Sequence, residues 1–141
     1  MNKKGSIDAP IALYVEVMLD CLILSDSIAV GVGEARPECM TVAEIGITSN
    51  DFAFSYRGPP GAMRVIVSLG SNDKTDSSDA LWYLREHING RVIWILPARR
   101  YQQAPVRKLA AHFGDKVVAI PSVRRDGVHP TDYRRLADLT R

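Results

Sequence analysis

Nearly continuous apolar runs, rich in β-branched residues, are the feature that most restricts how this chain can fold. The clear runs cover residues 22–24, 64–69, 91–96 and 116–120, and a weaker one covers residues 41–45. A strand with one face in solvent alternates apolar and polar residues, whereas a strand of a parallel sheet is covered on both faces and reads as a continuous apolar run. The runs therefore predict five strands in a parallel sheet.

Helical patterns lie between the later runs. Apolar residues recur at spacings of three and four over residues 78–88, after small polar residues that can cap a helix. Pro105 suits the first turn of a second helix, and Gly114 suits its end. Thr131 is a candidate cap for a final helix over residues 133–139. Strands and helices thus alternate along the chain.

This alternation, with short connections, predicts an α/β protein of flavodoxin-like type, a three-layer α/β/α sandwich around a central parallel five-stranded sheet. The chain of 141 residues fits a single domain over residues 1–141 and can bury one sizeable core. Residues 1–20 are an uncertain N-terminal lead-in, in which residues 11–19 fit either a strand or a helix.

Charge and hydropathy exclude several classes of protein. The net charge is only +2, and most basic residues lie after residue 70, so we expect a mildly positive C-terminal half and no nucleic-acid-binding stripe. Glu16 and Asp20 interrupt the longest apolar region, so no membrane span is expected. They also make the N-terminus a poor signal peptide, which favours a cytoplasmic location, with release by lysis or another route as the alternative.

The cysteines and glycines do not indicate a metal or a cofactor. Cys21 and Cys39 belong to no CxxC pair and to no Cys/His cluster with zinc spacing, so we expect a reduced, metal-free protein. Gly31 and Gly33 resemble the start of a dinucleotide fingerprint, but Arg36 stands where the third glycine is needed. No Gly-Lys-Ser or Gly-Lys-Thr sequence occurs, and no cofactor is expected.

Small polar residues follow three of the predicted strands. Ser27 follows the first, Asn72 follows the third, and Asp126 and His129 lie on the loop after the fifth. Each has an ordinary alternative as a helix cap or a turn residue. Because the carboxyl ends of parallel strands meet at one edge of a sheet, the four side chains are expected to converge there. A nucleophile, an oriented imidazole and an oxyanion donor are the parts that acyl transfer requires.

Three ordered blocks of this sequence resemble those of the SGNH hydrolases, the GDSL-type esterase superfamily. Ser25-Asp26-Ser27-Ile28 is similar to the family's first block, Gly70-Ser71-Asn72-Asp73 to its third, and Asp126-Gly127-Val128-His129 to its fifth. The blocks occur in the family's order, and the resemblance spans residues 22–137. It implies the SGNH hydrolase fold and a serine esterase that needs no cofactor.

The second block is the loosest match. Within residues 45–51, Ser49 stands where the family has a glycine whose backbone N–H stabilises the oxyanion, and Gly46 is the alternative donor. Ser25 also replaces a glycine, in the residues that lead into the nucleophile turn. A serine still has a backbone N–H, so the donor at position 49 is expected to survive the replacement.

The resemblance implies a mechanism with a catalytic triad. Ser27 would attack the ester carbonyl, His129 would take and return the proton, and Asp126 would hold the imidazole in the required tautomer. The oxyanion hole would consist of the Ser27 N–H, the Ser49 N–H and the Asn72 side-chain amide.

Few residues separate the blocks, so we expect a shallow, open site. Such a site favours small acyl groups, above all acetyl, on a small-molecule or glycan ester. Four arginines are expected to form a positively charged rim that favours anionic or polar substrates: Arg99, Arg100, Arg124 and Arg125. Two alternatives stay open, a catalytically degenerate SGNH-like domain that binds a ligand or partner, and a plain flavodoxin-like binding module.

Overall fold

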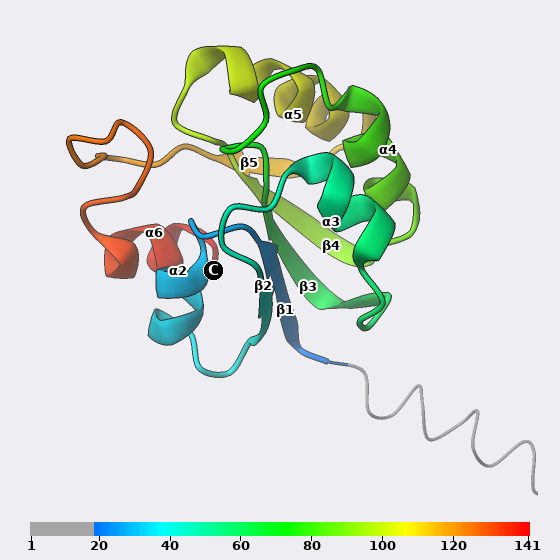
Figure 1. The fold of residues 1–141 in the computed structure, drawn as a ribbon. Helices are drawn as coiled ribbons and strands as arrows, with labels where there is room; N and C mark the ends of the chain where they lie inside the picture. The colour runs from blue at the N-terminus through cyan, green and yellow to red at the C-terminus, as the bar shows by residue number, and fades with distance from the viewer. Residues whose placement is uncertain (1–18) are drawn as a thin grey trace, which may run out of the picture.

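The structure is a computed structural model that describes residues 19–141, so nearly all of the expected lead-in lies outside the described residues (Figure 1). The strands are β1 (Cys21–Ser25), β2 (Met40–Ala43), β3 (Gly61–Ser68), β4 (Asn89–Ile95) and β5 (Lys116–Val118). The helices are α2 (Val30–Ala35), α3 (Ser49–Ser55), α4 (Ser78–Glu86), α5 (Arg100–Phe113) and α6 (Tyr133–Leu139). No helix in this part of the chain is long and apolar enough to cross a membrane.

The five strands form one parallel sheet in the order β2-β1-β3-β4-β5. Successive strand residues point to opposite faces, so Leu22 and Leu24 of β1 join one core cluster while Cys21 and Ile23 join another. The first cluster includes residues of α3, α4 and α5, and the second includes residues of α2 and α6. Figure 1 shows these two groups of helices on opposite faces of the sheet. The predicted three-layer α/β/α sandwich is confirmed.

Two helix starts differ from the predictions. Helix α5 begins at Arg100, so Pro105 lies inside the helix and not in its first turn. The helix accommodates this proline with the loss of one backbone hydrogen bond. Helix α6 is capped by Asp132, whose carboxylate accepts the Arg135 N–H at 3.0 Å, and not by Thr131. Neighbouring threonine and aspartate residues can both cap a helix, and the backbone conformation decides between them.

Helix α3 has no counterpart among the predicted elements. Its seven residues are too few to show a periodic apolar pattern. The sequence does hold a local signal, because a threonine followed three residues later by an acidic residue is a helix-start pattern. Thr48 and Asp51 have this spacing, and Thr48 Oγ1 accepts the Asp51 N–H at 3.2 Å.

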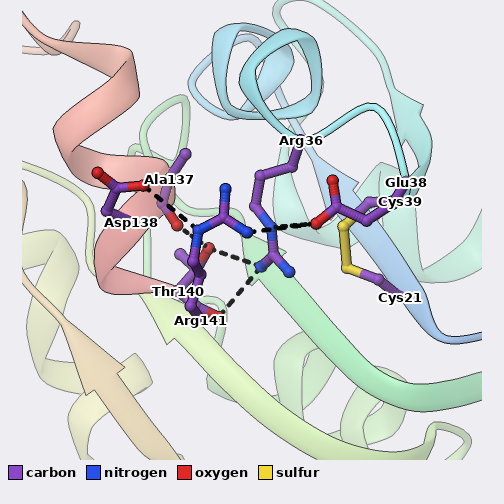
Figure 2. A network of polar contacts seen from close by, with 8 residues as sticks. All are labelled: Cys21, Arg36, Glu38, Cys39, Ala137, Asp138, Thr140 and Arg141. Carbon is purple, nitrogen blue, oxygen red and sulfur yellow. Dashed lines mark hydrogen bonds and ion pairs between the residues drawn. A yellow bond between two sulfur atoms is a disulfide. The ribbon is translucent and has the colours of Figure 1, made fainter.

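Cys21 and Cys39 form a disulfide, so the expectation of a reduced protein is wrong (Figure 2). Leu22 pairs with Met40 in adjacent parallel strands, and the residues just before them come to a Cα–Cα distance of 4.5 Å. Disulfide bridges require a distance of this order. The sequence hides the pairing because it depends on strand register, across a separation of 18 residues.

A buried arginine joins the C-terminal ends of α2 and α6 (Figure 2). Arg36 is only 3% exposed, and its Nη1 donates to the carbonyl of Thr140 at 3.2 Å and to the Oγ1 of Thr140 at 3.0 Å. Its Nε pairs with Glu38 at 3.2 Å, and Glu38 also contacts Arg141 at 3.4 Å. Because α2 follows the first sequence block and α6 follows the fifth, these contacts hold the two blocks in one structural unit.

Candidate active site

The carboxyl edge of the sheet brings together three of the predicted site residues. Ser27 follows β1, and its Oγ lies 3.0 Å from Nε2 of His129. The other ring nitrogen of His129, Nδ1, lies 2.7 Å from Oδ2 of Asp126. Ser27 and His129 are 102 positions apart in the chain, so only the tertiary fold can create this contact. In this arrangement the imidazole can accept the serine proton while the carboxylate holds its other nitrogen.

The loop after β5 holds Asp126 in one orientation. Its Oδ1 accepts the N–H groups of Val128 at 2.8 Å and His129 at 2.9 Å. The His129 carbonyl in turn accepts the Arg124 N–H at 2.7 Å, which closes the loop. The hydrogen bond from the His129 N–H, followed by that from Val128, lowers the pKa of Asp126 to about 2. Asp126 is therefore ionised at neutral and mildly acidic pH.

Ser25, at a position where the resembled family has glycine, points into the protein. Its hydroxyl accepts the Ala29 N–H at 3.0 Å and donates to the Asp26 carbonyl at 2.7 Å. The residue is fully buried. Its side chain therefore stabilises the turn that carries Ser27 and does not crowd the site.

The buried carboxylate of Asp26 supports the same turn. It accepts the Ile28 N–H at 2.9 Å and the Ser71 hydroxyl at 2.6 Å. Burial raises the pKa of Asp26, the hydrogen bonds from Ser71 and Ile28 oppose this shift, and the nearby Asp73 adds to it. Through Ser71, this carboxylate links the first sequence block to the third.

The backbone N–H groups of Ser27 and Gly46 lie on loops at this edge. Within residues 19–141, neither the Ser27 N–H nor the Gly46 N–H donates a hydrogen bond. Gly46 is exposed, with a φ of +82° that favours glycine, in a turn closed by the hydrogen bond from the Ile47 N–H to the Glu44 carbonyl. Gly46, the alternative to Ser49, therefore has an N–H that is available to a substrate.

The prediction of Ser49 as an oxyanion donor is wrong. Its N–H donates to Oδ1 of Asp73 at 2.8 Å, and its hydroxyl donates to Oδ2 of Asp73 at 2.6 Å. The residue is fully buried as the first residue of α3. An N–H already bonded to a carboxylate inside the protein is not available to a substrate oxygen. The short helix, which the sequence did not predict, turns this N–H inward.

Asn72 lies at the predicted edge and is fixed from two sides. Its Nδ2 donates to the Ile47 carbonyl at 3.0 Å, which leaves the second amide hydrogen for a substrate. Nε2 of the buried Gln102 donates to the Ser71 carbonyl at 3.1 Å and to the Asp73 carbonyl at 3.0 Å. These carbonyls flank Asn72. Sequence reasoning missed Gln102 because the residue precedes the predicted helix start and no local motif marks it.

The four predicted rim arginines are all exposed. Arg124 and Arg125 lie on the loop that carries Asp126 and His129, and the Arg124 guanidinium lies 5.7 Å from the centre of the Tyr133 ring. Arg99 and Arg100 lie at the start of α5. A basic rim formed by all four stays a prediction.

The site is open to solvent, with the side chains of His129 and Asp126 33% and 46% exposed. A cleft of about 410 Å³ lies between residues 73–78 and the first half of α5. Within residues 19–141, no group of three or more His, Cys, Asp or Glu side chains is arranged to hold a metal ion.

Comparisons with known proteins give matches to solved structures, but not to family models or curated proteins. No protein-family model matches the chain, and no curated protein matches it significantly. Among solved structures, the C-terminal catalytic domain of peptidoglycan O-acetyltransferase A (OatA) from Streptococcus pneumoniae, with a methylsulfonyl adduct, is similar at a TM-score of 0.55. The sequences are 14% identical, and the match covers 87% of this chain and 88% of that domain. The chain therefore has the fold of the SGNH hydrolases that its sequence blocks resemble.

Proposed function

We propose that this chain is a serine hydrolase that removes small acyl groups, above all acetyl, from sugar or glycan esters. The observation that carries the proposal is the chain of contacts from Ser27 Oγ through His129 to Asp126, at 3.0 and 2.7 Å. The similar solved domain is named a peptidoglycan O-acetyltransferase, which supports acetyl groups and glycans as the substrate chemistry.

In the first half of the reaction, Ser27 Oγ attacks the carbonyl carbon of the ester and its proton passes to Nε2 of His129. Negative charge develops on the carbonyl oxygen. The Ser27 N–H, the Gly46 N–H and the Asn72 amide would donate to that oxygen. The ionised Asp126 holds Nδ1–H of His129 and stabilises the imidazolium.

The tetrahedral intermediate then breaks its ester C–O bond. The alcohol leaves with the proton from His129 Nε2, and the acyl group stays on Ser27. A water molecule attacks the acyl carbon while His129 takes its proton, and the acid departs as the proton returns to Ser27. If a sugar hydroxyl attacks in place of water, the same residues perform a transfer, so the acceptor alone separates a hydrolase from a transferase.

The alternative is a degenerate domain that binds an acylated ligand without turnover. One observation favours it: the Ser49 N–H is bonded to Asp73 and does not serve as the donor that the family's glycine supplies. Both alternatives use the same edge of the sheet, but only the enzyme requires an activated Ser27.

A fluorophosphonate probe and p-nitrophenyl acetate together test the proposal. Wild-type protein should become labelled and should release p-nitrophenol, whereas Ser27→Ala should lose labelling and about 10⁴-fold of kcat. Ser55→Ala, which removes an exposed serine from α3, is the matched control and should behave as wild type. Retained labelling in Ser27→Ala would disprove the assigned nucleophile, and an unlabelled wild type would favour the degenerate domain.

A further inference from the structure

Three connected clefts line the seam between α3 and α4. The first, of about 330 Å³, shares Asn50, Asp79 and Ala80 with a second of about 230 Å³. The second shares Ala53 and Tyr83 with a third of about 240 Å³. Because neighbouring clefts share lining residues, they follow one another along the seam. We call this row of clefts the α3–α4 groove and define it by Thr48, Asn50 and Phe54 on one wall and Asp79, Tyr83 and His87 on the other.

The first cleft of the α3–α4 groove is lined by residues that directly follow Ile47 and Asn72 in the chain. Thr48 and Asp73 both line its first cleft. Thr48 directly follows Ile47, whose carbonyl accepts the hydrogen bond from Asn72, and Asp73 directly follows Asn72. Figure 1 shows α3 and α4 side by side, with α3 starting near the carboxyl edge of the sheet and running away from it. A molecule that lies in the groove therefore has one end next to the oxyanion donors.

The groove is longer than a small ester needs. From Asp79 to His87 it follows eight residues of α4 and its C-terminus, which at about 1.5 Å per residue is roughly 12 Å, and the first cleft adds to this length. An acetyl ester occupies only the space around Ser27. The remaining length suits a polymer that carries the ester.

The chemistry of the walls changes along the groove. Near the acyl site, Thr48, Asn50 and Asp79 offer hydroxyl, amide and carboxylate groups that can exchange hydrogen bonds with sugar hydroxyls. Farther along, Phe54 is 68% exposed and Tyr83 is 52% exposed. Their ring centroids are 6.5 Å apart, with the ring planes inclined by 24°, and the Tyr83 ring lies 4.3 Å from the His87 ring.

A glycan matches both parts of the groove. Sugar rings have hydroxyl edges that need hydrogen-bond partners and C–H faces that pack on the negative faces of aromatic rings. An acyl tail would need a continuous apolar tunnel, and a protein partner would need a broader apolar surface. The charged side chains that line the first cleft are Asp73, Lys74, Asp76 and Asp79, three acids and one base, so an anionic polymer is disfavoured there. We propose that the α3–α4 groove binds the neutral sugar units of an extended glycan and so presents an esterified unit to Ser27.

This inference rests on the proposed function for the position of the ester, but its binding test does not need turnover. The test uses the Ser27→Ala protein and chitotetraose, a neutral oligosaccharide, with chitobiose as the shorter probe and calorimetry as the readout. The tetramer should bind more tightly than the dimer. Phe54→Ala and Tyr83→Ala should each weaken binding of the tetramer by about tenfold, since truncating an aromatic anchor at an interface has effects of that order.

Two further variants make the result specific. Tyr83→Phe keeps the ring and should retain binding of the tetramer. Met63→Ala should leave binding of the tetramer unchanged. This substitution truncates an equally exposed apolar residue on β3, outside the groove. In the wild-type background, Phe54→Ala/Tyr83→Ala should lower kcat/KM for acetylated oligosaccharides more than for p-nitrophenyl acetate.

The outcomes separate this inference from the proposed function. Oligosaccharide binding without any esterase activity would support the groove and refute the enzyme. Esterase activity with tetramer binding that Phe54→Ala and Tyr83→Ala do not change, or with no tetramer binding, would refute the groove alone. If the aromatic variants instead convert a dimer into a monomer in analytical ultracentrifugation, the groove is an interface between two copies of the chain and the glycan proposal is wrong.

Discussion

Gly31 of α2 lies directly against the aromatic ring of Tyr133 of α6. A Cβ atom added at Gly31 would come within 2.4 Å of the ring, a distance that no real side chain adopts. The close approach of the two helices therefore depends on glycine at this position. Because Ser27 lies just before α2 and His129 just before α6, the separation of the helices also sets the distance between these two residues.

Gly31→Ala should consequently impair activity without removing the fold. The added methyl group pushes Tyr133 and α6 outward, and a displacement of about 1 Å between reacting groups can cost about 100-fold in rate. We expect kcat/KM for p-nitrophenyl acetate to fall by this order while a cooperative thermal transition is retained. In a Tyr133→Ala background the same substitution should cost much less. Equal losses in both backgrounds would show that the contact is irrelevant.

Asn72→Ala should lower kcat by roughly 10²–10³ and leave KM nearly unchanged, because an oxyanion donor acts mainly in the transition state. Steady-state kinetics with p-nitrophenyl acetate provide the measurement. A raised KM with an unchanged kcat would mark Asn72 as a ground-state binding residue.

Gln102→Met should act in the same direction through Asn72. The substitution keeps a similar length and removes the two hydrogen bonds that hold the carbonyls on either side of Asn72. We expect a smaller loss of kcat, about tenfold, and no further loss when it is added to Asn72→Ala. Additive effects of the two substitutions would contradict a positioning role for Gln102.

Asp126 should add no acid limb to the pH–rate profile above about pH 3. The hydrogen bonds from the His129 and Val128 N–H groups hold the pKa of this carboxyl at about 2, so it is already ionised there and holds Nδ1 of His129. The measurement is kcat/KM for p-nitrophenyl acetate against pH in the wild type and in Asp126→Asn. An acid limb above about pH 3 that Asp126→Asn removes would conflict with the hydrogen bonds that Asp126 accepts.

The change in stability caused by Asp26→Asn should be more favourable at neutral than at acidic pH. Burial raises the pKa of Asp26 in the folded state, so the unfolded chain ionises first as the pH increases. The wild type therefore loses stability as the pH rises from the unfolded pKa, near 3.8, through the raised folded pKa, and asparagine avoids this loss. The difference in Tm, variant minus wild type, should be larger at pH 7 than at pH 3.5. A constant difference would mean that the carboxyl titrates alike in both states.

The arginines on the His129 loop should attract acidic substrates. Screening shortens the Debye length from about 30 Å at 0.01 M salt to about 10 Å at 0.1 M, so kcat/KM for an acidic acetyl ester should be higher at the lower salt concentration. A neutral ester serves as the comparison, and Arg124→Ala/Arg125→Ala should abolish the difference. If the double variant responds to salt as the wild type does, the two arginines do not guide substrates.

The sheet and the contacts among Ser27, His129 and Asp126 were accessible from the sequence because their signals are local. Each buried strand is a continuous apolar run, Ser27 lies close to the end of β1, and His129 lies on the loop after β5. Parallel strands place those ends at one edge, so the topology alone predicts that residues separated by most of the chain meet there.

The failed predictions concern groups whose partners are set by tertiary contacts. The Ser49 N–H is directed by Asp73, which lies 24 residues later, and nothing near Ser49 shows this. The pairing of Cys21 with Cys39 depends in the same way on the register of β1 and β2. Gln102 supports Asn72 only because α5 starts earlier than Pro105 suggested.

The disulfide described above has a topological consequence. Ser27 and all of α2 lie between Cys21 and Cys39, so the candidate nucleophile belongs to a covalent ring of the chain. Closing a ring of this size lowers the conformational entropy of the unfolded chain, which raises the free energy of unfolding by about 3 kcal/mol. Protein made where thiols stay reduced would lack that contribution, and a protease cut inside an intact ring would leave both fragments joined. The segment that carries the nucleophile therefore keeps its attachment to the sheet even when its backbone is broken.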